Sequence, residues 1–102
     1  MLVSWASSAH RDLLEISKYF LKNEGKEVAT AVAQRIIDSA RILESFPLSG
    51  KIGRIEGTRE MQAKRLPYVL VYQTFDTKTE ILRVFHTSKL FPSVLEEYNL
   101  GL

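Results

Sequence analysis

Cysteine is absent from this chain of 102 residues, which excludes disulfides and thiolate metal sites. The two histidines, His10 and His86, lie far apart in sequence and lack the spacing of metal ligands. No run of about 18 apolar residues predicts a membrane-spanning helix. The N-terminal segment also lacks the basic start and apolar run of a secretory signal. We therefore expect a cytoplasmic protein with no metal, no cofactor and no membrane association.

Glycine is scarce, and its placement excludes two common kinds of enzyme. Gly50, Gly53 and Gly57 fall within one loop, but no Lys followed by Ser or Thr on a helix completes a phosphate-binding loop. No Gly-x-Ser-x-Gly segment is present, so the nucleophile turn of the α/β-hydrolases is missing as well.

The size and charge of the chain indicate a globular protein with one basic segment. With 45% hydrophobic and 25% charged residues, the chain is typical of a globular protein, and we expect one domain over residues 1–102. The net charge is only +2, yet residues 51–65 carry five basic and two acidic side chains. Such a patch attracts phosphate or an acidic protein surface. The alternative is a solvated charged face without a partner.

The first half of the chain predicts a helical hairpin. Ser7 or Ser8 is expected to cap a first helix with Asp12 in its first turn, and Asn23-Glu24-Gly25 should end it. Its apolar stripe consists of Ala9, Leu13, Ile16 and Phe20. A second amphipathic helix is predicted over residues 26–45, ending before Pro47. Because the connection is short, the two helices must pack antiparallel.

The second half predicts strands. Residues 68–75 are rich in β-branched and aromatic side chains, and residues 80–86 form a hairpin with them. Residues 58–65 alternate weakly, residues 2–5 can form a strand, and a capping box predicts a short helix over residues 94–98. The order β-α-α-β-β-β-α indicates an α+β fold, with the helical hairpin packed on a small, mainly antiparallel sheet.

The candidate site is a basic and aromatic cluster. Cleavage of RNA beside a 2′-hydroxyl needs a base, a cation near the phosphate and an acid for the leaving oxygen. Arg65, His86 and Lys89 are the candidate catalytic residues if the protein is a nuclease. Arg59 is expected to share a strand face with Arg65, the alternative being an ion pair with a helix carboxylate such as Glu15. The candidate target-binding residues are Lys51, Arg54, Arg59, Lys64 and Arg83.

Several short segments, taken in order, resemble the RelE/ParE superfamily of type II toxin–antitoxin toxins over nearly the whole chain. They are Ala9-x-x-Asp12-Leu13-x-x-Ile16, Phe46-Pro47, Gly57-Thr58-Arg59-Glu60, Pro67-Tyr68-Val69-Leu70-Val71-Tyr72, and Ile81-Leu82-Arg83-Val84-Phe85-His86 with Lys89. The resemblance implies two helices on a small antiparallel sheet, and a toxin held inactive by a cognate antitoxin.

The resemblance leaves three activities open. ParE-like members block DNA gyrase, and RelE-like members cleave mRNA on the ribosome without a metal. In RelE a catalytic arginine follows the tyrosine that opens the central strand, and this chain has Val69 there, which slightly favours gyrase. The third alternative is a module that binds its antitoxin without being toxic. In the first two cases the partners are the antitoxin and either gyrase or the ribosome with its mRNA.

Overall fold

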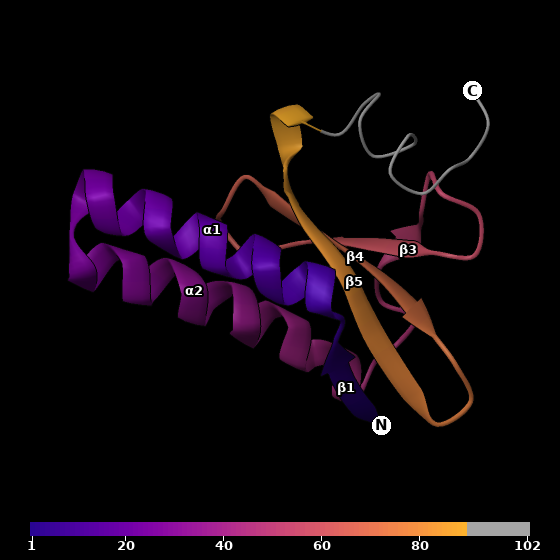
Figure 1. The fold of residues 1–102 in the computed structure, drawn as a ribbon. Coiled ribbons are helices and arrows are strands. Elements are labelled where there is room, and N and C mark those ends of the chain that lie inside the picture. The colour runs from indigo at the N-terminus through magenta and orange to yellow at the C-terminus, as the bar shows by residue number, and fades with distance from the viewer. Residues whose placement is uncertain (90–102) are drawn as a thin grey trace.

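The computed structural model describes residues 1–89 and has two layers, a helical hairpin and a mixed five-stranded sheet (Figure 1). The elements are β1 (Leu2–Trp5), α1 (Ser7–Glu24), α2 (Lys26–Arg41), β2 (Lys51–Ile52), β3 (Arg59–Gln62), β4 (Tyr68–Thr74) and β5 (Lys78–His86). Two 3₁₀ turns, Ile42–Glu44 and Thr87–Lys89, follow α2 and β5. The predicted α+β fold is confirmed.

The helices end close to where the sequence predicts. Helix α1 ends at Glu24 because Gly25 adopts a positive φ of 95°, which an L side chain rarely tolerates. Helix α2 ends at Arg41 and continues only as a 3₁₀ turn, so the prediction of a helix over residues 26–45 is too long. The two helices pack side by side, antiparallel, as expected (Figure 1).

The predicted start of α1 is wrong in its details. Ala6 occupies the N-cap position without a capping side chain, and the Ser8 hydroxyl donates instead to the Leu82 carbonyl at 2.7 Å. Asp12 lies beyond the first turn. Both side chains reach β5, because α1 runs along the part of this strand that extends past its partner β1. Helix α1 thus protects an otherwise open sheet edge.

The strand order in the sheet is β1-β5-β4-β3-β2, with β1 parallel to β5 and the other pairs antiparallel. The two-residue strand β2 was not predicted, because it is too short to show alternation. The predicted strand over residues 58–65 is shorter than expected and ends at Gln62. The helix predicted over residues 94–98 lies outside the described residues.

A β-bulge sets the side-chain pattern of β5. Val71 pairs with Arg83 and Tyr72 pairs with Ile81, which leaves Leu82 as the extra residue. Ile81 and Val84 are therefore both buried, although strict alternation would place them on opposite faces. The bulge also puts Val84 and His86 on the side of the sheet that faces the helices, while Arg83 alternates with them and reaches Asp12 of α1 at the edge of the sheet.

The core lies between the hairpin and one face of the sheet. Alternate residues of β4 point into it, and α2 contributes the fully buried Ile36. The central buried residues are Ala9, Val32, Ile36, Ala40, Leu43, Ala63, Tyr68, Leu70, Tyr72, Ile81 and Val84. The other face of β3 and β4 carries Glu60, Gln62 and Val69, and the basic loop after α2 borders this face.

Candidate functional site

Two of the predicted basic residues border a hollow of about 590 Å³ on the sheet face that points away from the helices. We call this site the basic hollow, and define it by Lys51, Arg54, Glu60, Gln62, Val69 and Thr87. Lys51 and Arg54 provide two positive charges, against the single negative charge of Glu60. The hollow is therefore suited to an anionic group or an acidic side chain.

The loop that carries Lys51 is held against the sheet by Tyr72. The Tyr72 hydroxyl accepts a hydrogen bond from the Gly50 amide at 2.9 Å and donates to the Pro47 carbonyl at 3.0 Å. Burial raises the pKa of Tyr72, so the phenol keeps the proton that it donates. Gly50 is required here, because a Cβ atom at this position would lie 2.5 Å from the tyrosine oxygen. The position of Lys51 thus depends on a buried tyrosine.

Arg54 is oriented by a buried carboxylate. Glu60 is only 5% exposed, and its Oε2 accepts a hydrogen bond from the Arg54 amide at 2.9 Å. The Arg54 Nε lies 3.3 Å from Glu60 Oε1, so backbone and side chain are both fixed by the same acid. The sequence prediction missed Glu60, because a single Glu in a weakly alternating strand looks like a solvated residue.

Arg59 has a structural contact that differs from both alternatives considered above. Its Nη1 donates to the Gly50 carbonyl at 2.8 Å, so it supports the same loop as Tyr72. The alternative of an ion pair with Glu15 is therefore wrong. The expectation that Arg59 shares a strand face with Arg65 is also wrong, because β3 ends at Gln62 and Arg65 lies in the following turn with a φ of 60°.

Lys64 and Arg65 are exposed on the turn between β3 and β4 and do not line the basic hollow. The Lys64 amide is fixed by the Ser39 hydroxyl of α2 at 3.0 Å, while its side chain is exposed to solvent. Lys89 is the last described residue, and its side chain lies outside the described part of the structure. Their roles in target binding or catalysis stay predictions.

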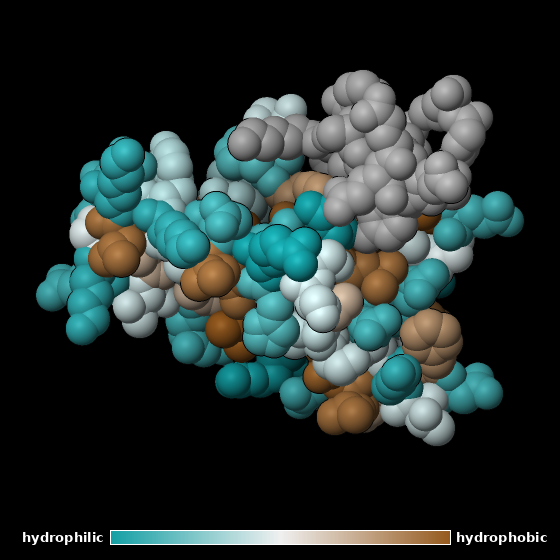
Figure 2. Space-filling view, in the orientation of Figure 1, coloured by the Kyte–Doolittle hydropathy of each residue, from teal (hydrophilic) through white to brown (hydrophobic). Residues whose placement is uncertain are grey.

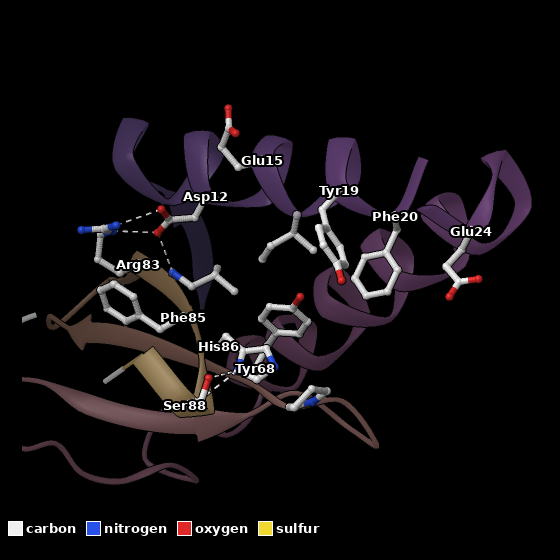
Figure 3. Close-up of a pocket in the computed structure, with 13 residues that line it drawn as sticks. Asp12, Glu15, Tyr19, Phe20, Glu24, Tyr68, Arg83, Phe85, His86 and Ser88 are labelled. Carbon is white, nitrogen blue, oxygen red and sulfur yellow. Dashed lines mark hydrogen bonds and ion pairs between the residues drawn. The ribbon is translucent and has the colours of Figure 1, made fainter. Parts of the chain in front are cut away.

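His86 lies in a different place, a groove of about 680 Å³ between α1 and the adjoining ends of β4 and β5 (Figure 3). We call it the aromatic groove, and its principal residues are Asp12, Tyr19, Phe20, Glu24, Tyr68, Arg83, His86 and Ser88. The His86 Nδ1 accepts a hydrogen bond from the Ser88 amide at 3.1 Å. In the neutral ring the proton is therefore on Nε2.

Arg83 is held at one end of the aromatic groove by Asp12. Its Nε and Nη2 donate to the Asp12 carboxylate at 2.7 and 2.9 Å, and the guanidinium lies 4.5 Å from the centre of the Phe85 ring. Asp12 also accepts the Val84 amide at 2.9 Å. The bidentate geometry makes this a strong, partly buried ion pair, which the sequence prediction missed because 71 residues separate the partners.

The outer face of the helical hairpin has a third hollow. Leu14, Leu21 and Ala29 border a shallow groove of about 380 Å³ between α1 and α2. Leu14 and Leu21 are each 54% exposed, and Figure 2 shows brown apolar side chains among teal polar ones over the two helices. An apolar surface of this kind on a helix pair suits a partner helix.

The fold matches that of solved toxin–antitoxin proteins. A ParDE toxin–antitoxin structure from P. aeruginosa superimposes with a TM-score of 0.79 at 23% identity, covering 84% of this chain and 95% of that one. A RelBE2 toxin–antitoxin complex from Mycobacterium tuberculosis gives a TM-score of 0.57 at 32% identity, covering 83% of this chain and 95% of that one. The class is therefore that of the toxins of type II toxin–antitoxin systems.

Sequence comparison defines the family. The model of the family described as the ParE toxin of the type II toxin–antitoxin system parDE matches residues 3–91. The protein "Putative toxin Y4kP" of Sinorhizobium fredii is 37% identical over 93 residues, which cover 91% of this chain and 95% of that protein. This chain belongs to the ParE toxin family, within the RelE/ParE superfamily. Within residues 1–89, no helix is long and apolar enough to cross a membrane.

Proposed function

We propose that this protein inhibits growth by binding DNA gyrase, with the basic hollow facing its target. The observation that carries the proposal is the placement of the candidate residues on different surfaces. Of the candidate catalytic residues, His86 lines the aromatic groove and Arg65 lies on an exposed turn without lining it, while the target-binding candidates Lys51 and Arg54 border the basic hollow on the other face of the sheet. General acid–base cleavage requires such groups within hydrogen-bond reach of one phosphate.

The charges that line the aromatic groove also argue against cleavage of RNA there. A phosphate beside His86 would meet the carboxylate of Glu24, which repels it, while the charge of Asp12 is neutralised by Arg83. The guanidinium that lines the groove, that of Arg83, already forms two hydrogen bonds with Asp12. The position that holds a catalytic arginine in RelE is occupied by Val69, a buried apolar residue. The arrangement therefore supports binding without cleavage.

We further propose that a cognate antitoxin covers the apolar groove of the helical hairpin with an amphipathic helix. The exposed leucines of α1 supply the contact surface. A stable complex of this kind should bury at least about 1,000 Å² in total. The proposed target and partner are both cytoplasmic, so the protein is expected to act there.

Induced expression tests the proposal through two separate readouts, plasmid supercoiling and the integrity of mRNA during translation. We expect growth to stop, plasmids to lose negative supercoiling, and mRNA to remain intact. Co-expression of the protein encoded by the adjoining gene should restore growth. Cleaved mRNA with normal supercoiling would contradict the proposal.

The second candidate is a ribosome-dependent mRNA endonuclease. It is favoured by the basic hollow, where Lys51 and Arg54 lie beside Gln62 and Thr87 on an open sheet face that suits a nucleic-acid backbone. Under this alternative, the double variant Lys51→Ala, Arg54→Ala abolishes mRNA cleavage, and supercoiling is unaffected by the wild-type protein.

A further inference from the structure

We propose that the aromatic groove binds a cationic side chain, an arginine or a lysine, from the antitoxin. The identity of the partner rests on the function proposed above, whereas the chemistry of the groove stands by itself. This surface is separate from the basic hollow and lies on the opposite side of the sheet. The toxin would then meet its antitoxin through a negatively charged site as well as through apolar contacts.

Aromatic rings form the walls of the groove. Tyr19 and Phe20 on α1 pack edge to face at 5.2 Å, and Tyr68 and His86 on the sheet do so at 5.4 Å. Figure 3 shows the rings of Tyr19 and Phe20 pointing from α1 toward Tyr68 and His86. A cation placed over such rings is attracted by the negative face of each π-system. The rings of Tyr19, Phe20 and Tyr68 thus provide surfaces that favour a guanidinium or an ammonium group.

The charge of the groove is negative. Asp12 and Arg83 neutralise each other, and Glu15, which also lines the groove, lies 3.8 Å from Lys18. Within residues 1–89, Glu24 forms no ion pair. As the last residue of α1, it also adjoins the negative end of the helix dipole. Glu24 and the helix end therefore attract a cation to the same end of the groove.

The polar atoms of the groove fit a cation better than an anion or an aliphatic side chain. Burial, and to a lesser extent Tyr19, raises the pKa of Tyr68, so its hydroxyl stays neutral and can accept a hydrogen bond from a bound cation. The Tyr19 side chain is 60% exposed, so the groove is open to solvent. A volume of about 680 Å³ accommodates an arginine with neighbouring residues.

The first test is a peptide titration of the full chain monitored by NMR. The probe is acetyl-Gly-Arg-Gly-amide, and acetyl-Gly-citrulline-Gly-amide is the uncharged control of almost the same shape. We expect the arginine peptide to shift the signals of Tyr19, Phe20, Tyr68 and His86, and the citrulline peptide to shift them far less. Equal binding of both peptides, no binding, or shifts confined to other surfaces would overturn the proposal.

Substitutions locate the site. Glu24→Gln removes the charge and keeps the shape, and should weaken binding of the arginine peptide about two- to fivefold, as expected of an exposed ion pair. Tyr19→Leu removes one aromatic wall and should weaken it by about the same factor. The matched control is Glu27→Gln, because Glu27 is an exposed carboxylate near the start of α2 that does not line the groove. An effect of Glu27→Gln as large as that of Glu24→Gln would refute the assignment.

The second test uses the toxin with the purified product of the adjoining gene. Glu24→Gln should lower the affinity of this complex, and Glu27→Gln should leave it unchanged. An unchanged affinity of the Glu24→Gln complex would refute a role for the groove in antitoxin binding. These outcomes can be told apart from those that test the proposed function. If the protein binds the arginine peptide but does not inhibit growth, only the proposed function is refuted. If it inhibits growth but does not bind the peptide, only the proposal for the aromatic groove is refuted.

Discussion

Replacement of Tyr72 by Phe isolates the contact that fixes the basic loop. The aromatic ring stays in the core, so no cavity is created, and only the hydroxyl is lost. The Gly50 amide and the Pro47 carbonyl lose their hydrogen bonds of 2.9 and 3.0 Å. A hydrogen bond contributes about 1 kcal/mol net, and where its loss leaves a buried donor unpaired the cost of that bond is instead about 1–3 kcal/mol. We expect the free energy of unfolding to fall by about 2–3 kcal/mol.

The assay is urea unfolding followed by circular dichroism, with a thermal scan beside it. For a chain of this size, the expected loss lowers Tm by roughly 10–20 °C, and the urea m-value should not change. Tyr19→Phe is the control, because that side chain is 60% exposed, and its effect should stay within about 0.5 kcal/mol. A Tyr72→Phe variant as stable as this control would refute the argument that the hydroxyl holds the loop.

Three further changes test other parts of the structure. Asp12→Asn leaves the Arg83 guanidinium in a partly buried site without its counter-charge, and should lower the free energy of unfolding in urea by about 2–4 kcal/mol; a loss below about 0.5 kcal/mol would contradict this. Gly50→Ala forces a Cβ atom against Tyr72 and should lower the free energy of unfolding by about 1–3 kcal/mol. A Gly50→Ala variant as stable as the wild-type protein would contradict this, because it would show that the loop adjusts freely. Finally, Tyr68 and Tyr72 have raised pKa values in the folded protein. Their contribution to the free energy of unfolding is therefore complete below about pH 10 and is lost as the pH rises through the folded pKa values. A Tm that does not change above about pH 10 would contradict this prediction.

Local sequence signals were sufficient for most of the fold. The helical spacing of Ala9 and Ile36 with their neighbours identified the buried faces of both helices, and the β-branched run of β4 identified the central strand. Gly25 ended α1 as predicted, because its backbone conformation is a property of the residue itself. Signals of this kind depend on residues within a few positions of one another, and for that reason they can be recognised in a single chain.

The errors arose where distant parts of the chain determine the result. The bulge at Leu82 depends on how β5 pairs with β4, so the shared burial of Ile81 and Val84 could not be inferred from alternation. Asp12 was assigned to the helix dipole, although its partner is Arg83. Charge alone grouped the basic residues, but it did not separate Arg59, which supports the loop, from side chains that face solvent.

The central claim is that this toxin acts on DNA gyrase without cleaving mRNA, and a supercoiling assay with purified gyrase tests it most directly. We expect the wild-type protein to inhibit supercoiling, and the double variant Lys51→Ala, Arg54→Ala to inhibit it much less, because the basic hollow loses its charge. Translating ribosomes given the same protein should keep their mRNA intact. Full gyrase activity at saturating toxin, together with mRNA cut on the ribosome, would contradict the account.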